Sequence, residues 1–291
     1  MINVFRFGKE KIKTSLHNSK SYRNKQTING KKVVKHRVNI EYSNFPVDAP
    51  LNIGDTLTPV VFEYIKNKYS LVEKKLKQTT HLNMIGSIIA FKKYDAVIWG
   101  SGILNEDFER KIKFNAKHVK YDIRAVRGPL TRDILIRCGY DCPNVFGDPA
   151  ILMPLIYKPK NKTKKYKISI IKHYRDDTEI PNGLHEISVV TSDYKYFIDE
   201  ICASELVVSS SLHGLIIAES FGIPTIWYNP QGRGTFKYKD WYLSIGIKDP
   251  AVINNISEIG EKRNVGLDCK ISQLVEPLMN SFPFELWSKK Q

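Results

Sequence analysis

The chain has 291 residues, of which 42% are hydrophobic and 11% aromatic. A chain of this length and composition can bury a large core, which argues against global disorder and allows one large domain or two ordinary ones. Lys and Arg number 45 against 30 Asp and Glu, so the formal net charge is +15 and anionic partners are favoured. Nucleic acid, anionic lipid surfaces and phosphorylated small molecules are all negatively charged and are all compatible with this charge.

The cysteines and the apolar runs indicate the cellular compartment of the protein. Cys138, Cys142, Cys202 and Cys269 lack the paired spacing of a zinc site, so we expect no metal and four buried or neutral thiols in a reducing environment. The first residues contain no apolar core of a signal peptide, and no apolar run approaches the ~18 residues that span a bilayer. We therefore expect a cytoplasmic protein, with peripheral contact at the inner face of the membrane as an option.

A strongly basic segment comes first. Residues 9–37 contain ten Lys or Arg residues and one acid, Glu10. We expect residues 1–37 to form a basic N-terminal arm, or a hairpin that turns at Asn29 and Gly30. A solvated face is the simpler interpretation of this segment, and contact with an anionic membrane is the alternative.

The next segment has the pattern of an α/β unit. Residues 38–42 alternate as a strand, residues 57–65 have helical periodicity, and the apolar run 96–99 ends in a glycine-rich turn. Residues 124–129 form a further strand and turn, and a helix is expected from Pro129 to about residue 137. The basic stretch 157–167 is a polar connector and marks a domain boundary.

The pattern starts again after this connector. Strands are expected at 168–171, 186–190, 206–208 and 224–228, with helices at 194–203 and 215–221. We therefore predict two doubly wound Rossmann-like α/β domains, over residues 38–157 and 168–270. A C-terminal helix within residues 271–291 is expected to be able to pack back on the first domain. Ligands of such sheets bind beyond the carboxyl ends of the strands, so the loops at Asn52, Gly100, Arg127, His173 and Ser209 should converge on a cleft between the domains.

The segment from Ser209 to Gly214 carries the sharpest chemical signal. Hydroxyls and N–H groups at a helix N-terminus can bind an anion, and a glycine allows close approach to the backbone. His213 can change charge near neutral pH. The alternative is that the serines only cap the helix and that His213 packs beneath it.

Seven blocks of residues carry a family resemblance. Residues 210–224 form the first, and the other six are 52–55, 99–102, 125–132, 147–150, 172–174 and 236–242. Together, over residues 38–246, they resemble the exopolysaccharide-type polysaccharide pyruvyl transferases. The resemblance implies a fold like that of the GT-B glycosyltransferases and phosphoenolpyruvate as a co-substrate, with no cofactor. The implied reaction moves the enolpyruvyl group onto two sugar hydroxyls to form a pyruvate ketal, in exopolysaccharide or capsule biosynthesis.

The resemblance also suggests a donor side and an acceptor side. The C-terminal domain would bind phosphoenolpyruvate, and the N-terminal domain a glycan acceptor, for which a lipid-linked oligosaccharide is the expectation. The donor carries a carboxylate and a phosphate and needs several cations. We expect Arg127 to be the first, since Gly128 and Pro129 follow it at the end of a strand. The remaining donor residues would be Lys172, Ser210, Ser211, Leu212 and Gly214.

Other branches of the family carry Arg two residues before the motif histidine, where this chain has Ser211. The second cation must then come from elsewhere, with Lys172, Arg233 and Lys237 as candidates. The expected acceptor or cleft residues are Asn52, Gly54, Gly100, Ser101, Gly102, Arg233 and Lys237.

Three residues are candidates for catalysis. His213 and His173 are candidate general acids, and the sequence does not decide between them. Asp55 either orients the acceptor or caps the helix that follows, and capping is the favoured interpretation. Asp148, before Pro149, is expected to brace a loop.

Two rival functions agree with parts of the sequence. A GT-B-type glycosyltransferase with a nucleotide-sugar donor would share the architecture, but Glu219 stands alone where an acidic pair could hold a ribose. A nucleic-acid-binding module would use the basic charge, but the sequence has no zinc finger, helix-turn-helix or aromatic RNA-binding block. We therefore expect no nucleic-acid partner.

Overall fold

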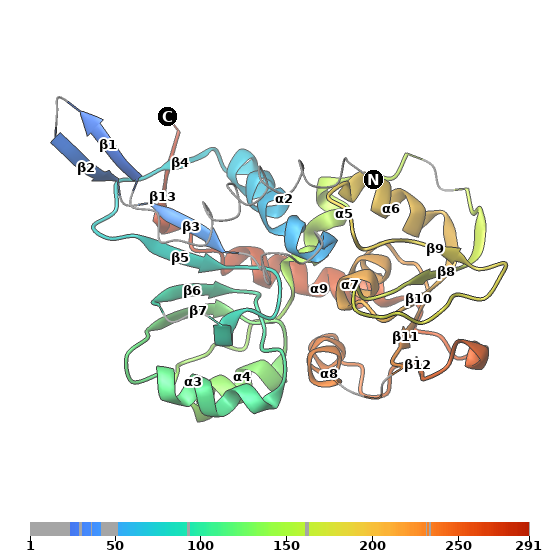
Figure 1. Ribbon diagram of the computed structural model, residues 1–291. Coiled ribbons are helices and arrows are strands. Elements are labelled where there is room, and N and C mark those ends of the chain that lie inside the picture. The colour runs from blue at the N-terminus through green and yellow to red at the C-terminus, as the bar shows by residue number, and fades with distance from the viewer. Residues whose placement is uncertain are drawn as a thin grey trace, which may run out of the picture.

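Two parallel β-sheets, one from each half of the chain, organise the computed structural model (Figure 1). The structure describes residues 24–28, 31–35, 37–41, 52–91, 94–160, 163–230, 232 and 234–290. Its mixed α/β architecture with parallel sheets agrees with the Rossmann-like class predicted from the sequence.

The first sheet has the strand order β3-β5-β6-β7, and every pair in it is parallel. Its strands are β3 (Val38–Glu41), β5 (Thr80–Asn83), β6 (Ala96–Trp99) and β7 (Tyr121–Ala125). The order does not reverse among these described strands, so this half lacks the doubly wound order that was predicted. The apolar residues 84–91 that follow β5 form no strand, and Gly86 among them has φ +105°.

Helices nevertheless cover both faces of this sheet. They are α2 (Ile53–Lys68), α3 (Glu109–Asn115), α4 (Pro129–Arg137) and the short α5 (Met153–Ile156), with 3₁₀ turns η1 (Ile89–Phe91), η2 (Glu106–Phe108) and η3 (Pro149–Leu152). Side chains alternate along β6, so Val97 and Trp99 share a core cluster with α2, whereas Ala96 and Ile98 pack with α3 and α4. A strand buried on both faces explains why residues 96–99 are apolar throughout.

The second sheet has the order β12-β11-β10-β8-β9, again entirely parallel. Its strands are β8 (Tyr166–Ile171), β9 (His185–Glu186), β10 (Ser204–Ser209), β11 (Thr225–Tyr228) and β12 (Val252–Ile253). Because β9 and β10 lie on opposite sides of β8, this is the doubly wound order predicted for this half. Ligands bind such sheets beyond the carboxyl ends of the strands where the order reverses, here β8 and β10.

Four longer helices follow in this half. They are α6 (Tyr194–Cys202), α7 (Leu212–Ser220), α8 (Phe236–Ser244) and α9 (Leu267–Asn280), with 3₁₀ turns η4 (Ile256–Glu258) and η5 (Phe284–Leu286). Every residue of α7 except His213 is buried. A helix that is apolar on all sides belongs in a protein interior, and α7 packs against α6, α9, β10 and β11.

The end of the chain returns to the first half (Figure 1). Strand β13 (Trp287–Lys289) pairs with β4 (Leu71–Glu73) in antiparallel register. The indole N–H of Trp99 donates to the carbonyl of Leu278 at 2.8 Å, and its ring packs against Phe282 at 4.9 Å. One hydrophobic cluster therefore runs through both halves. The division into domains at residues 157–167 stays a prediction.

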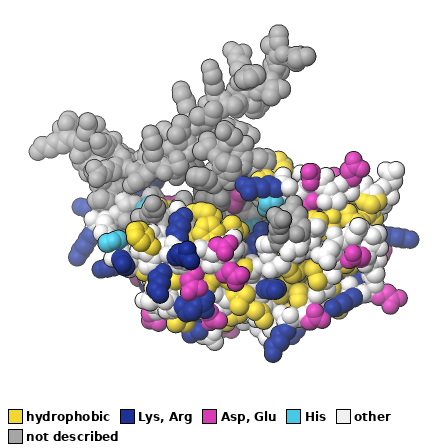
Figure 2. Space-filling view, turned by 60° about the horizontal axis from the view of Figure 1, so that its bottom comes forward, with side chains coloured by type: hydrophobic (Ala, Val, Ile, Leu, Met, Phe, Trp, Pro, Cys, Tyr) yellow, Lys and Arg dark blue, Asp and Glu magenta, His cyan; other side chains and the backbone are white. Residues whose placement is uncertain are grey.

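Several other predictions concern the surface and the thiols. The described part of the basic arm contains β1 (Asn24–Ile28) and β2 (Lys31–Lys35), which pair as antiparallel strands, while the expected turn at Asn29 and Gly30 and the remainder of the arm lie outside the described residues. None of the four cysteines forms a disulfide; Cys138, Cys142 and Cys202 are buried, as expected, and Cys269 is exposed. On the face shown in Figure 2, Lys and Arg side chains are interspersed with Asp and Glu side chains. Among the described residues, no helix is long and apolar enough to cross a membrane.

Candidate active site

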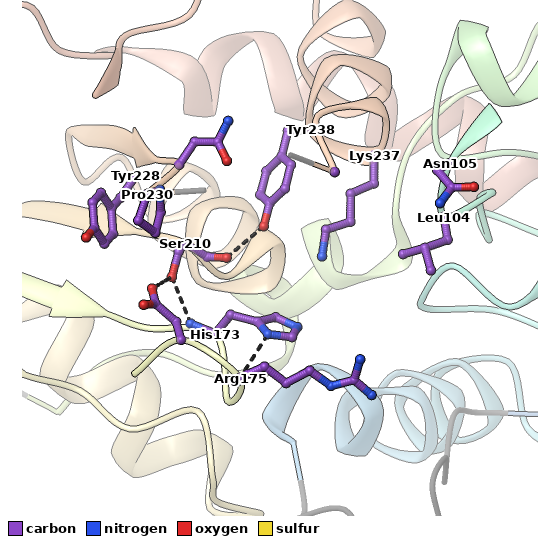
Figure 3. Close-up of a pocket in the computed structure, with 12 residues that line it drawn as sticks. Leu104, Asn105, His173, Arg175, Ser210, Tyr228, Pro230, Lys237 and Tyr238 are labelled. Carbon is purple, nitrogen blue, oxygen red and sulfur yellow. Dashed lines mark hydrogen bonds between the residues drawn. The ribbon is translucent and has the colours of Figure 1, made fainter. Parts of the chain in front are cut away.

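A pocket of about 290 Å³ lies at the carboxyl ends of β8, β10 and β11 (Figure 3). Both halves of the chain contribute to its lining, which consists of Leu104, Asn105, His173, Arg175, Asp176, Ser210, Tyr228, Asn229, Pro230, Gly234, Lys237 and Tyr238. The polar lining residues come mainly from the loop after β8, the end of β10 and the first turn of α8. The pocket thus lies where the strand order of the second sheet reverses.

Ser210 connects the loops that form this pocket. Its hydroxyl accepts the backbone N–H of His173 at 2.9 Å and donates to the carboxylate of Asp176. The hydroxyl of Tyr238 donates to the carbonyl of Ser210 at 2.7 Å (Figure 3). These bonds fix the loop after β8 and the start of α8 against the end of β10.

The two neighbouring serines have structural partners. The hydroxyl of Ser209 donates to the carbonyl of Ile171 and accepts the N–H of Ser211. Ser211 is the N-cap of α7, and its hydroxyl accepts the N–H of Gly214 at 3.4 Å. The capping alternative is therefore correct for Ser211, and of the three serines only Ser210 lines this pocket.

Gly214 and Leu212, predicted to contact the donor, serve packing instead. A Cβ on Gly214 would come within 2.6 Å of the Ser209 hydroxyl and 2.9 Å of Ile171 Cγ2. Glycine is required there because α7 approaches β8 closely, not because a ligand approaches the backbone. Leu212 is buried in the core.

His213 lies in a cradle formed by the other half of the chain. A Cβ on Gly54 would fall 2.0 Å from Nδ1 of His213, so the ring occupies the space that a side chain would fill. The side chain of Asn52 caps α2 by accepting the N–H of Gly54 at 3.0 Å. On its other side, His213 Nε2 lies 3.6 Å from Oδ2 of Asp148. Asn52 and Gly54 thus shape the site through the position of this ring.

Asp55 belongs to the same cluster. Burial raises the pKa of its carboxyl group to about 6, against the opposing effects of His213 and Lys237. The cap of α2 is Asn52, so the interpretation of Asp55 as a helix cap is wrong. A carboxyl group with a pKa of about 6 can exchange a proton near neutral pH, which suits a general base.

The pocket also holds three basic side chains. Burial, with Arg127 and Arg175 nearby, lowers the pKa of Lys237 to about 8, although Asp55 opposes the shift. Burial, followed by Lys237 and Arg175, lowers the pKa of His173 to about 4, so this imidazole is neutral at pH 7. Lys237 extends from α8 toward His173 and Arg175 (Figure 3). Sequence reasoning missed Arg175, although its place four residues beyond the end of β8 was the available signal.

Lys172 and Arg233 do not supply the second cation in the described structure. The Lys172 ammonium donates to the carbonyl of Thr178 at 2.8 Å and lies 3.5 Å from the Glu186 carboxylate. It is therefore engaged away from the pocket, contrary to the prediction. Arg233 lies outside the described residues.

Arg127, predicted to bind the donor, is completely buried behind the pocket. Its Nε donates to the carboxylate of Asp240 at 3.0 Å, Nη1 to the hydroxyl of Ser87 and Nη2 to the carbonyl of Ile103. Asp240 also accepts the backbone N–H and the hydroxyl of Thr131. A guanidinium enclosed by such partners acts as an internal brace, so the prediction of an exposed donor clamp is wrong.

The glycine-rich turn after β6 also packs internally. Gly100 has φ +83°, and a Cβ there would fall 2.4 Å from Pro149. The hydroxyl of Ser101 donates to the carbonyl of Gly86, and Gly102 lies directly against the Arg127 guanidinium. These three residues were expected in an acceptor cleft, and instead they support Arg127 and η3.

Glu219 is enclosed within the second half. Its carboxylate accepts hydrogen bonds from Thr225, Trp241 and Tyr242 at 2.7–2.8 Å. Burial raises the pKa of this group to about 7, and the three hydrogen bonds oppose the shift. A carboxylate occupied in this way has no oxygen free for a ribose, which weighs against a nucleotide-sugar site here.

No group of three or more His, Cys, Asp and Glu side chains in the described part of the chain is arranged to hold a metal ion. The expectation that the reaction needs no metal stays a prediction.

The parallel sheets, with a polar pocket at their carboxyl ends, define a Rossmann-like α/β protein with an enzyme-like site. Residues 73–232, more than half of the chain, match the family described as polysaccharide pyruvyl transferase. The chain belongs to this family of transferases, as the resemblance of the seven blocks implied.

Individual relatives agree with this assignment. The chain is 30% identical over 138 residues to the succinoglycan biosynthesis protein ExoV of Rhizobium meliloti (strain 1021), which covers 44% of this chain and 42% of that protein. It is 28% identical over 230 residues to an uncharacterized protein of Acanthamoeba polyphaga mimivirus, covering 73% of this chain and 77% of the relative. A crystal structure of an uncharacterized Klebsiella pneumoniae protein shares the fold, with a TM-score of 0.51 and 15% identity over 76% of this chain and 94% of that one.

Replacing Arg127 by Met should lower the free energy of unfolding by ~3–5 kcal/mol, because Asp240 is left buried without its partner. Arg124→Met is the matched control: this arginine pairs with Asp122 and Glu285 on the surface and should contribute at most ~1 kcal/mol. Urea unfolding followed by circular dichroism measures both. Equal, small effects would show that Arg127 is not a structural brace.

Replacing Gly54 by Ala should displace the His213 ring, since the added methyl group would overlap it. We expect a loss of activity together with a loss of stability of ~1–3 kcal/mol, because the ring lies between Gly54 and Asp148 and has little room to move. Gly260→Ala is the control, since the nearest atom to its new Cβ is 3.7 Å away. Activity assays and thermal unfolding of both variants test this; full activity of Gly54→Ala would separate His213 from the reaction.

Proposed function

We propose that the protein transfers the enolpyruvyl group of phosphoenolpyruvate to two hydroxyls of a glycan, which become bridged as a pyruvate ketal. The observation that carries this proposal is the cluster at the reversal point of the second sheet. There, basic side chains of Lys237 and Arg175 line a pocket that also contains His173, and Asp55 and His213 interact electrostatically with this group. A small polyanionic donor needs such cations, and proton transfer needs groups with pKa values near neutrality.

The cations are suited to the two anionic ends of the donor. Arg175 presents a planar guanidinium at the mouth of the pocket, which matches the geometry of a carboxylate or phosphate. Lys237 is half-buried, where its charge is less screened by water than that of a surface lysine. These two residues replace Arg127 and Lys172 in the proposed donor site, and Ser210 holds the loop that carries Arg175.

The chemistry can be written as a balanced sequence. His213 gives a proton to the methylene carbon of the donor, and the first sugar hydroxyl bonds to the adjacent carbon as Asp55 accepts its proton. Inorganic phosphate leaves as the second hydroxyl bonds to the same carbon. The proton that Asp55 took from the first hydroxyl is released to solvent and balances the proton that His213 gave to the new methyl group, while the proton of the second hydroxyl leaves with the phosphate. The cations stabilise the departing phosphate electrostatically.

His213 is the better candidate for the acid. Because its pKa is low, the His173 imidazole is neutral at pH 7 and is not available as a cationic acid that could protonate the donor. It can instead act as a hydrogen-bonding partner of the donor. His213 also lies near two carboxylates, Asp55 and Asp148.

The acceptor has space next to the donor pocket. A second cavity of about 390 Å³ between α4 and α8 shares Asn105 and Gly234 with it. Carboxylates of Asp107 and Asp133 and the ring of Phe236 also line this cavity. Carboxylates accept hydrogen bonds from sugar hydroxyls, and an aromatic ring can pack against the apolar face of a sugar.

The cellular context is part of the proposal. An acceptor in exopolysaccharide or capsule biosynthesis, bound to a lipid carrier, would place the enzyme in the cytoplasm at the inner face of a membrane. The basic arm at residues 1–37 would there contact anionic lipids, with ~1 kcal/mol for each basic residue near the surface. This part of the proposal rests on the charge of the sequence, since most of the arm lies outside the described residues.

The direct test is incubation with phosphoenolpyruvate and a panel of oligosaccharides. We expect a glycan product with the mass of an added pyruvate ketal, together with release of inorganic phosphate. His213→Gln should lower turnover by ~10²–10⁴-fold while donor affinity is largely retained, since glutamine cannot supply the proton. Transfer of sugar from a nucleotide sugar, without use of phosphoenolpyruvate, would favour the glycosyltransferase alternative.

The dependence of kcat/KM on pH should be bell-shaped. Below about pH 6 Asp55 becomes protonated and cannot accept a proton from the acceptor, and above about pH 8 Lys237 loses the charge that binds the donor. Asp55→Asn should remove the acidic limb along with most activity, and Lys237→Gln should remove the alkaline limb and raise the KM for the donor. Rates measured across this pH range decide the matter, and a profile unchanged by either substitution would exclude these roles.

A further inference from the structure

Two buried polar atoms face each other without a hydrogen bond. Oδ2 of Asp148 and Nε2 of His213 are 3.6 Å apart, and neither atom has another partner. The Asp148 side chain is 1% exposed and that of His213 is 14% exposed. An isolated buried carboxylate oxygen is unfavourable by several kcal/mol unless it is paired, and pairing here needs only a small approach of the two side chains.

The backbone orients the carboxylate toward the ring. The other oxygen of Asp148 accepts the N–H of Ala150 at 3.0 Å and so caps η3. Pro149 follows directly and packs against Gly100, which restricts the loop further. Oδ2 of Asp148 is therefore held in position by the hydrogen bond between Oδ1 and Ala150, which involves no residue of the proposed active site.

The ring of His213 is confined on its opposite side. Nδ1 lies beside the Cα of Gly54, where a Cβ would fall only 2.0 Å away. Nε2 is enclosed, so the exposed part of the side chain belongs to its other atoms. The charged or titratable groups near the ring are Asp148 from η3, Asp55 from α2 and His173 from the loop after β8, and Lys237 from α8 interacts with Asp55 and His173.

We infer that Asp148 is a positioning residue for His213. Its Oδ2 accepts the Nε2 proton of His213, which leaves Nδ1 as the nitrogen that exchanges a proton with the substrate. The catalytic part of this inference rests on the proposed function, whereas the pairing itself does not.

The arrangement has a consequence for the reaction. The Nε2 proton stays with His213 throughout, while the Nδ1 proton passes to the methylene carbon of the donor and is regained from solvent. A carboxylate that fixes the tautomer of a catalytic histidine is a known use of such a pair.

The test uses ¹⁵N NMR of the histidine side chains in the full chain. His213→Gln assigns the signals of His213 among the seven histidines. In the unsubstituted protein we expect the neutral ring to carry its proton on Nε2. Asp148→Asn should move the neutral-ring proton to Nδ1, because the asparagine amide can donate to Nε2.

Asp148→Asn is a conservative variant because its amide oxygen can still accept the N–H of Ala150. Asp141→Asn, an exposed position in the same region, is the control and should leave the tautomer of His213 unchanged. Thermal unfolding of both variants checks that η3 is retained. A His213 tautomer that is the same with and without the Asp148 carboxylate would overturn the inference.

Kinetics separate this inference from the proposed function. With phosphoenolpyruvate and a glycan that is turned over, Asp148→Asn should lower kcat by ~10²–10⁴-fold with a smaller change in the KM for the donor. An NMR shift as expected, in a protein that transfers no pyruvyl group, would uphold the pairing and refute the proposed reaction. An unchanged kcat would remove Asp148 from the reaction even if the pairing exists.

Discussion

Arg127 and Asp240 meet without any exposed surface on either side chain, and much of the pocket geometry depends on their ion pair. Arg127 follows β7 in the first half, and Asp240 lies on α8 in the second. Asp240 also accepts two hydrogen bonds from Thr131 at the start of α4. Because the loss of one partner would leave a buried charge, α8 is fixed relative to the first sheet. The same helix presents Lys237 and Tyr238 to the pocket, so the ion pair sets the position of a proposed donor ligand without touching the donor.

A second connection between the halves lies at the start of α2. The N–H of Ile53 donates to the carbonyl of Val189 at 2.8 Å, and Gly54 receives the ring of His213. In both connections the contacting residue lies close to a functional group. Asp55 directly follows Gly54, and Lys237 lies one helical turn before Asp240 on α8. The relative position of the halves and the positions of the reacting groups are therefore determined by the same contacts. A substitution that shifts one half should change the site before it unfolds the protein.

The sequence predicted the class of the fold, the use of the carboxyl ends of the strands and several members of the site. His173, Ser210 and Lys237 line the pocket, and Asp55 lies near His213, because polar residues at strand ends and helix starts gather at one edge of a parallel sheet. The sequence could not show which polar groups would find internal partners. Arg127 and Lys172 have the right chemistry and the right place along the chain, but Asp240 lies 113 residues from Arg127 and its role is visible only after folding. Asp148 was missed as a partner of His213 for the same reason, since its cap of η3 is local but the ring that it faces comes from the other half.

Burial affects the groups of the site in opposite directions, and this has a bearing on selectivity. Burial lowers the pKa values of Lys237 and His173 and raises that of Asp55, so the empty pocket is less strongly charged than its residues would suggest. A bound anion acts in the other direction on the cations, since it favours their protonated forms. A donor with both a carboxylate and a phosphate would gain more from this effect than a singly charged ligand. The net charge of +15 attracts many anions to the protein, but the coupling between ligand charge and protonation in the pocket can select among them. In the proposed reaction the same coupling would keep Lys237 protonated while the donor is bound, which joins donor recognition to the stabilisation of the leaving phosphate.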